Sequence, residues 1–410
     1  MRGILLCLLT GGTAFAQASL PPPSTYLMDT ASGTARNPLS WPAPMLMERS
    51  QDWNLMFMGQ GFLVDTQQSG PRGGDKLYST NWGMISAGHS LGGGSVLLKT
   101  MLSLEPLTVT DRRYPELFQT GETAFGVPLA DAQHPHNFLM ELSAQYAHSL
   151  GAQAMLQLYY APVGDPALGP VAYPHRASAA EIPQAPLGHH WQDSTHIAGN
   201  VATVAIRYKW VSLEGSGFYG TEPDENRWRI PWGPMNSYAA RLSIFPNRNW
   251  VAQASFGRLA RPERQEPGDI MRATASIAYS LRMGDHAWST SFIWGRNHDT
   301  STGRNLNSYL LESVYPVNGK NFVTGRIEVV DKDELFASEP ELAEEIDRAS
   351  GSTFRIREYI AGYTRDIATY RNLEIGLGFN VSFYGIPDAI QPYYGDRPVG
   401  GNIFLRVRLQ

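Results

Sequence analysis

The stretch LEIGLGFNVSF, from Leu373 to Phe383, decides the fold. Its apolar residues alternate without exception with Glu, Gly, Asn and Ser. Such period-two alternation is typical of a β-strand with one apolar and one polar face. Strands of soluble sandwiches usually have about five or six residues, whereas a tilted strand that crosses a membrane needs about 9 to 11. The length of this stretch therefore favours a membrane-crossing strand.

The end of the chain repeats the pattern. Apolar residues occupy every second position from Ile403 to Leu409, and Arg406 and Arg408 lie on the other face. This terminal strand resembles the C-terminal signature of outer-membrane barrels, although the chain ends in Gln410 where an aromatic residue is commoner. Similar segments precede these two and bring the expected total to about sixteen strands: 53–64, 77–89, 94–105, 137–148, 152–161, 195–208, 210–219, 236–246, 249–259, 270–283, 286–297, 305–316, 319–330 and 354–366.

The connections between these segments alternate in length, as in bacterial barrels with short periplasmic turns and long extracellular loops. An all-β fold follows: a transmembrane antiparallel up-and-down β-barrel with both termini on the periplasmic side. The short links are 90–93, 149–151, 209, 246–249, 283–285, 316–319 and 367–370. The long loops are 65–76, 106–136, 162–194, 220–235, 260–269, 298–304, 331–353 and 384–400.

The first residues of the chain predict a segment that is removed. Arg2 precedes an apolar run at 4–9, and 14–16 has the A-x-A spacing of a secretory cleavage site. Cys7, the one cysteine, lies inside this segment, so disulfides and thiolate chemistry are not expected afterwards. The chain then divides into three parts: a signal peptide at 1–16, an extension in the periplasm or lumen at 17–51, and the outer-membrane barrel at 52–410.

Charge and hydropathy exclude several classes of function. The formal net charge of -5 on 410 residues predicts no nucleic-acid partner. Beyond the signal, no run reaches the roughly 18 apolar residues of a transmembrane helix. Charged residues within the strands are expected to face the lumen, because a cation at the lipid midplane costs roughly 2–4 kcal/mol. The set of residues expected to face the lumen contains both signs of charge, so it indicates no preference for anions or cations. These residues could equally form ion pairs that brace the wall. The set is Glu141, Arg207, Glu214, Arg241, Arg272, Glu312, Arg326, Glu328, Glu358 and Glu374.

One motif points to a different class of protein. The string GHSLG at 88–92 resembles the nucleophile elbow of α/β-hydrolase lipases, in which a strained turn exposes the serine, here Ser90. A hydrolase also needs strands that alternate with helices, and only 331–353 looks helical. Glycines at 92–94 equally suit a hairpin turn. We therefore expect a protein without enzyme activity, and a lipase or esterase that uses Ser90 is a remote alternative. A membrane-embedded hydrolase that uses Ser194 with a nearby histidine and acid is a second remote alternative.

Two long loops are rich in metal-ligating side chains. They flank the expected hairpin of 137–148 and 152–161, so their histidines are expected to converge at the outer mouth. Imidazoles and carboxylates without thiolates suit Zn or Cu, although no spacing matches a defined metal motif. The pairs Met45, Met47 and Met56, Met58 would add soft ligands for copper; otherwise they are ordinary fillers, as the histidines are loop struts. The predicted ligand set is Asp131, His134, His136, His175, His189, His190, Asp193 and His196.

Several longer strings, among them QHPHN, PLGHHWQDSTHI and EPDENRW, resemble a group of uncharacterised, porin-like bacterial outer-membrane barrel proteins. The resemblance spans nearly all of the chain after the signal and implies fold and location, but no activity. The expected partners are outer-membrane lipid and lipopolysaccharide, the barrel-assembly machinery, and small solutes or metal ions. The working hypothesis is a porin-like channel or receptor for small solutes, and a metal-binding surface barrel is its rival.

Overall fold

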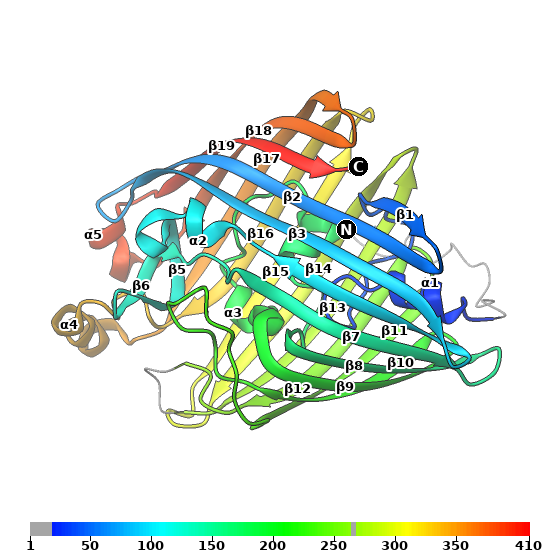
Figure 1. The fold of residues 1–410 in the computed structure, drawn as a ribbon. Coiled ribbons are helices and arrows are strands. Elements are labelled where there is room, and N and C mark those ends of the chain that lie inside the picture. Colours follow the sequence, from blue (N-terminus) through cyan, green and yellow to red (C-terminus); the bar gives the residue numbers. More distant parts are fainter. Residues whose placement is uncertain (1–18, 264–267) are drawn as a thin grey trace, which may run out of the picture.

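Sixteen antiparallel strands close into one barrel in the computed structural model, which describes residues 19–263 and 268–410 (Figure 1). The predicted signal peptide lies outside the described residues. The barrel strands are β2 (Trp53–Gln68), β3 (Asp75–Leu91), β4 (Gly94–Leu102), β7 (Leu139–Ser149), β8 (Ala154–Gly164), β9 (Ala198–Tyr208), β10 (Val211–Tyr219), β11 (Ser237–Asn247), β12 (Trp250–Leu259), β13 (Ile270–Met283), β14 (His286–Asp299), β15 (Asn305–Pro316), β16 (Asn321–Lys332), β17 (Phe354–Tyr370), β18 (Leu373–Gly385) and β19 (Val399–Leu409).

Pairing between the first and last barrel strands closes the ring. Residues 400–408 of β19 lie antiparallel to residues 60–68 of β2, and every other barrel strand pairs with its neighbours in chain order. The predicted antiparallel up-and-down barrel is thereby confirmed, and each of the sixteen predicted segments corresponds to one strand. The strands have 9 to 17 residues, the lengths that tilted crossing of a bilayer requires.

Short turns join the strands at one end of the barrel. Gly92 and Gly93 connect β3 to β4 with φ angles of 55° and 79°, a left-handed conformation that only glycine adopts without strain. The turn expected at 367–370 is misplaced, because β17 continues to Tyr370 and turns at Arg371. A register shift between Asp366 and Ala368 interrupts the alternation there, which hid the end of the strand.

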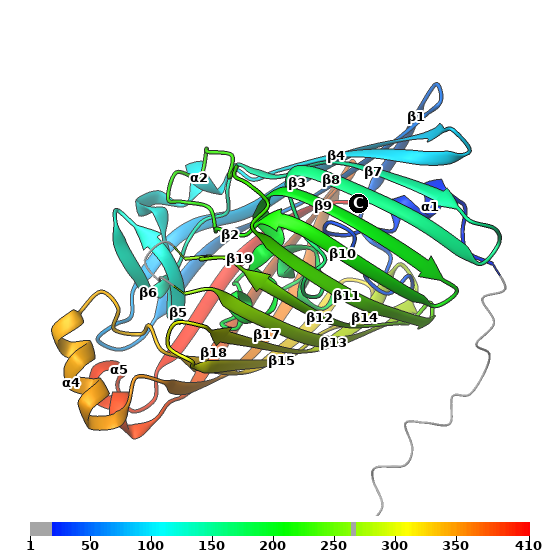
Figure 2. The same ribbon diagram turned by 90° about the horizontal axis from the view of Figure 1, so that it is seen from below.

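The remaining elements lie at the two ends of the barrel or inside it. At the long-loop end are α2, α4, α5 and the β5–β6 hairpin, whereas α1 lies at the short-turn end (Figures 1 and 2). The helical character predicted within 331–353 is confirmed by α4; strands β1, β5 and β6 were not predicted. No helix in the described residues is long and apolar enough to cross a membrane. The bounds are α1 (Pro23–Met28), β1 (Leu46–Ser50), α2 (Glu105–Thr108), β5 (Tyr114–Ala124), β6 (Val127–Gln133), α3 (His189–Gln192), α4 (Pro340–Ser350) and α5 (Gln391–Tyr394).

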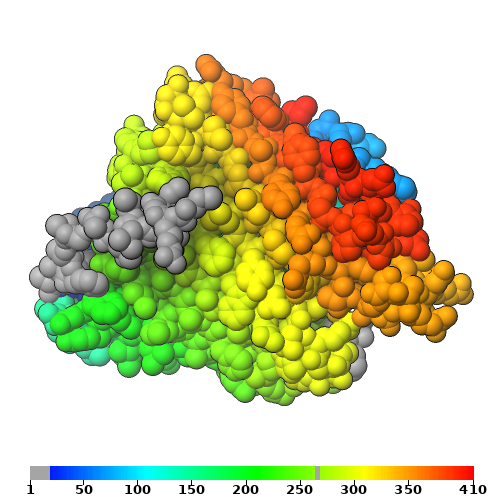
Figure 3. All heavy atoms as spheres, turned by 180° about the vertical axis from the view of Figure 1, so that it is seen from behind, coloured from blue at the N-terminus to red at the C-terminus, as the bar shows by residue number. Residues whose placement is uncertain are grey.

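The two faces of the wall differ in polarity. On β15, Tyr309 and Leu311 are 42% and 47% exposed on the outside, whereas Leu310 and Glu312 are buried inside. The same alternation runs around the ring, and the rear face is a continuous wall formed by the later strands (Figure 3). An apolar outer belt and a charged inner face are what a lipid-spanning barrel requires.

Two segments fill the interior. The first is the connection between β8 and β9, residues 165–197, called here the lumen loop, and nearly all of its residues are buried. It carries α3, which lies within the barrel in Figures 1 and 2. The second is the N-terminal segment 20–45, in which Thr34 bonds Glu214 of β10 and Asn37 bonds the His175 carbonyl of the lumen loop. The barrel is therefore packed along much of its length.

Introducing a charge on the outer belt tests the membrane-facing surface. Leu311→Arg should lower the free energy of unfolding in lipid vesicles by about 2–4 kcal/mol, because the guanidinium must enter hydrocarbon. Val317→Arg, in the exposed turn after β15, is the control and should have little effect. Denaturant titration measures both variants, and equal losses would contradict a lipid-facing position for Leu311.

Candidate functional site

Buried ion pairs fasten the lumen loop to the barrel wall. Arg176 of the loop lies with Nε 2.6 Å from Glu312 of β15 and Nη1 3.0 Å from Asp193 of the loop itself. Glu312 also accepts a hydrogen bond from Ser178 and pairs with Arg326 of β16 at 3.1 Å. Because all four charges are nearly inaccessible to solvent, each depends on the others for compensation.

A second set of contacts holds other residues of the lumen loop against the wall. Glu328 of β16 accepts hydrogen bonds from the backbone N–H groups of Leu187 and Gly188, at 3.1 and 2.9 Å. Glu181 of the loop pairs with Arg408 of β19 at 2.8 Å and with the adjacent Arg406. The wall thus supplies partners for backbone groups that a buried loop could not otherwise satisfy.

The ten residues predicted to line the lumen all have buried side chains: Glu141, Arg207, Glu214, Arg241, Arg272, Glu312, Arg326, Glu328, Glu358 and Glu374. Several form ion pairs across neighbouring strands, among them Glu214 with Arg241 at 2.5 Å. Sequence reasoning did not include Arg406 and Arg408, although the alternation of the last strand already placed them opposite its apolar face. Arg176 and Glu181 carried no such signal, because a loop has no periodicity.

Three histidines gather between the lumen loop and the loop before β7. His136 directs Nδ1 at Glu105 of α2, at 2.9 Å, and His189 directs Nδ1 at Asp193. His196 directs Nδ1 at the Asp193 carbonyl, 2.9 Å away. The ring centroids are 5.4 Å apart for His136 and His196, and 5.2 Å apart for His189 and His196. Carboxylate and carbonyl partners on Nδ1 fix the orientation of each imidazole.

The structure brings together only part of the predicted ligand set. His190 and His134 extend the cluster: the ring centroid of His190 is 5.3 Å from that of His189 and 6.0 Å from that of His134. Asp131 lies elsewhere and bonds Arg72 and Tyr394, and His175 packs against Trp82 of β3. Among the described residues, one compact group of ligating atoms includes a predicted residue: His190 with Glu222 and Glu263. A second compact group contains none of the predicted ligands: His286, Asp366 and Glu374.

Burial controls protonation in this region. It lowers the pKa of His134, His190 and His196 well below the usual value, with further lowering from neighbouring cations and imidazoles. Burial alone would raise the pKa of Asp193, but His189 and Arg176 hold it well below its ordinary range. His134, His190 and His196 are therefore neutral near pH 7. Both ring nitrogens of His190 are buried without a hydrogen-bond partner.

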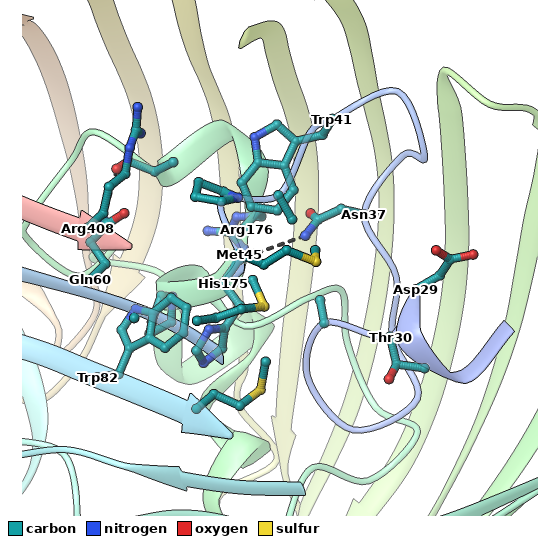
Figure 4. Close-up of a pocket in the computed structure, with 18 of the residues that line it drawn as sticks. Asp29, Thr30, Asn37, Trp41, Met45, Gln60, Trp82, His175, Arg176 and Arg408 are labelled. Carbon is teal, nitrogen blue, oxygen red and sulfur yellow. Dashed lines mark hydrogen bonds between the residues drawn. The ribbon is translucent and has the colours of Figure 1, made fainter. Parts of the chain in front are cut away.

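Cavities remain at both ends of the packed lumen. At the long-loop end a vestibule of about 580 Å³ is lined by six carboxylates, and Arg112 is the one cation among its described lining residues. Burial, and then Glu122, raise the pKa of Glu222 in this vestibule to about 8. Toward the short-turn end lies a cavity of about 130 Å³, drawn in Figure 4, with Trp41, Met45, Trp82 and His175 around it. The carboxylates of the vestibule are Glu122, Glu222, Asp224, Glu225, Glu263 and Glu334.

The serine motif is part of a hairpin. Ser90 lies at the end of β3 opposite Ser95 of β4, so a strand follows the turn where a hydrolase elbow needs a helix. His89 stacks on Trp53, with ring centroids 4.8 Å apart. Ser194 bonds Glu222 and Arg272 rather than a histidine. Neither serine has the setting of an activated nucleophile.

Comparison with solved structures identifies the architecture. Salmonella typhi OmpF in complex with daunomycin aligns with a TM-score of 0.55 at 9% identity, over 89% of this chain and 100% of that chain. The fold is that of bacterial porins. An anion-selective porin from Comamonas acidovorans aligns with a TM-score of 0.52 at 13% identity, over 87% and 99% of the two chains. A loop-deletion mutant of Vibrio cholerae OmpT aligns with the same TM-score at 7% identity, over 87% and 100%.

No family profile matches the chain, and no curated protein is similar to it in sequence. The likeness therefore rests on architecture. The closed barrel and its apolar exterior are those of a bacterial outer-membrane protein, as the sequence predicts. At these identities the solved structures establish the fold alone.

Removing the central charge tests how the lumen loop is held. Glu312→Gln should cost about 3–5 kcal/mol of stability, because Arg176 and Arg326 lose the carboxylate that both depend on. Hydrogen exchange should rise in residues 165–197 in particular.

The matched control is Glu344→Gln in the exposed pair with Arg348 on α4, which should cost about 0–1 kcal/mol. Denaturant titration and mass-resolved hydrogen exchange measure both variants. Unchanged exchange in the lumen loop of Glu312→Gln would show that the ion pair does not hold the loop.

Proposed function

We propose that this barrel is a porin-like passage for small cationic solutes, narrowed by the lumen loop. The observation that carries the proposal is the carboxylate-lined vestibule at the long-loop end. Clefts lined by one sign of charge concentrate counter-ions and accelerate their entry. Arg112 is the one cation among the described lining residues of the vestibule, although Glu122, Asp224 and Glu225 each have an arginine partner, whereas in the deeper lumen charges of both signs line the wall and pair with the loop.

A discontinuous series of small spaces leads inward from the vestibule. A cavity of about 40 Å³ shares Glu263 and Glu334 with it and reaches His190. From His190 the imidazoles of His189 and His196 lie in edge-to-face and tilted contact and lead to His136, which lines a space of about 30 Å³. That space shares Trp82 with the cavity at the short-turn end. A solute on this route would meet carboxylates, then imidazoles, then thioethers.

The structural neighbours are compatible with passage of small molecules but not with one charge preference. The Comamonas acidovorans porin is described as anion-selective, and the Salmonella typhi OmpF structure contains daunomycin. The acidic vestibule of this chain favours the opposite sign of ion from the first of these proteins. Barrels of about sixteen strands leave an aqueous lumen unless a segment fills it. Here the lumen loop fills it, so we propose small conductance in the state described.

Surroundings and assembly belong to the same proposal. Arg355 and Arg357 point outward at the long-loop end of β17, where lipopolysaccharide phosphates would meet them. The terminal strand β19 would be the element that the barrel-assembly machinery recognises. Segment 17–51 would be a periplasmic extension that has entered the lumen after removal of residues 1–16.

Planar bilayers test the passage. The full-length protein should give small, cation-preferring conductance, and replacement of 170–186 by a short Gly-Ser linker should raise it toward that of an open barrel. Glu225→Gln with Glu263→Gln should reduce the cation preference, most strongly at low salt where screening is weak.

Replacing 341–349 of the exposed helix α4 by the same linker is the control and should leave conductance unchanged. Reversal potentials in a salt gradient measure the preference. Absence of conductance from both the full-length protein and the 170–186 variant would refute a pore.

A second candidate function is metal binding at the vestibule. It is favoured by His190, whose two buried ring nitrogens have no hydrogen-bond partner and one of which lies within 4.8 Å of carboxylate oxygens of Glu222 and Glu263. Imidazole with carboxylates suits Zn or Cu(II). The structure therefore supports a smaller and different ligand set from the one expected on sequence grounds.

Calorimetric titration of Zn into the purified barrel tests this candidate. Saturable binding should be lost in His190→Ala and weakened in Glu222→Gln, because each removes a ligand. His298→Ala, whose ring bonds Asn305 at the rim, is the control and should bind as the unmodified protein does. Equal binding in His190→Ala and in the unmodified protein would exclude the site.

A further inference from the structure

Methionines form a row across the inner face of three neighbouring strands. Met58 of β2 lies directly opposite Met84 of β3, and Met84 lies directly opposite Met101 of β4. The inner face of a barrel is normally polar, and Thr80 and Lys99 show this character on the same face of β3 and β4. The row therefore interrupts the polar lining at one level of the lumen.

Residues from outside the wall complete a methionine-lined cavity at this level. Met45 of the N-terminal segment and His175 of the lumen loop border the cavity of about 130 Å³ together with Met58 and Met84. In Figure 4 Met45, Trp82 and His175 surround this space, with methionine sulfur atoms beside them. Three separate parts of the chain thus bring soft donor atoms to one place.

The imidazole in this cavity is available as a ligand. The side chain of His175 is buried and lines the cavity. One nitrogen of a neutral imidazole carries a lone pair that can bind a metal ion. The ring packs edge-to-face against Trp82, with centroids 4.3 Å apart, which restricts its orientation.

The donor set discriminates among cations. Thioethers and imidazole are neutral, and thioethers prefer soft ions such as Cu(I), whereas Mg²⁺ and Ca²⁺ require carboxylate or carbonyl oxygens. The cationic side chains that border the cavity, Arg176 and Arg408, are already paired with carboxylates. A role as apolar filler accounts for single methionines, but not for their alignment beside a cavity that a histidine also borders.

We propose that this cavity binds one soft monovalent cation, Cu(I), through the thioethers of Met45, Met58 and Met84 and the imidazole of His175. The site differs from the vestibule group in place and in donor chemistry. The cavity lies at the inner end of the proposed passage, but the proposal does not depend on conduction, since an ion can bind here in a barrel that conducts nothing.

Silver(I) is the probe, because it shares the softness and charge of Cu(I) and needs no reductant. Ag(I) is titrated into full-length protein in detergent micelles, with heat and the methyl resonances of ¹³C-labelled methionine as readouts. One saturable site is expected, with resonance shifts confined to the cavity methionines. Met45→Leu/Met58→Leu/Met84→Leu keeps side-chain volume and should weaken binding by more than the roughly 10- to 100-fold typical of outer-sphere changes.

Met47→Leu is the matched control, because Met47 is 51% exposed and outside the cavity, and it should bind Ag(I) normally. His175→Ala supplies an independent variant that leaves the methionines in place and should also weaken binding. Heat-modifiable migration on gels confirms that each barrel is folded. The proposal is overturned if the unmodified protein shows no saturable Ag(I) binding, or if the triple variant binds as tightly as Met47→Leu.

Discussion

The interior of this barrel depends on compensation between buried charges of the wall and of the lumen loop. A loop inside a barrel brings backbone donors and acceptors away from water, where each unsatisfied group is costly. Glu328 satisfies two of these backbone groups, because it accepts hydrogen bonds from the N–H groups of two loop residues. In the opposite direction, Arg176 of the loop compensates Glu312 of the wall. Loop and wall are each unfavourable alone and stable together.

This mutual dependence determines where cavities remain. Along the contact between the lumen loop and strands β15, β16 and β19, ion pairs and hydrogen bonds leave little free space. The larger spaces are the vestibule and the cavity toward the short turns, which the lumen loop borders together with the N-terminal segment. The two ends are lined by different segments, so one end is rich in carboxylates and the other in thioethers. The chemical asymmetry of the lumen is thus a consequence of how the loop is packed.

The fold could be predicted from the sequence because apolar and polar residues alternate along a strand whose two faces meet different surroundings. The Leu373–Phe383 stretch and its counterparts therefore located all sixteen barrel strands. Alternation failed where β17 carries a register shift, and it carried no information about loops. The sequence predicted that histidines of the two loops flanking one hairpin would converge, and His136 and His196 do lie together. The position of His175 beside the methionine row depends on the path of the lumen loop, which no local pattern encodes.

In such a lumen, the inserted segments are better suited than the wall to discriminate among solutes. The wall charges are largely consumed in holding the loop, and charges paired at short range project little field into the remaining space. The vestibule carboxylates lie in connections between barrel strands, and His175 and Met45 come from the lumen loop and the N-terminal segment. Replacing those segments would change the ligand chemistry while the outer belt and strand pairing stayed intact. The barrel can therefore keep one membrane-facing surface, while the segments inside it determine which side chains line its cavities.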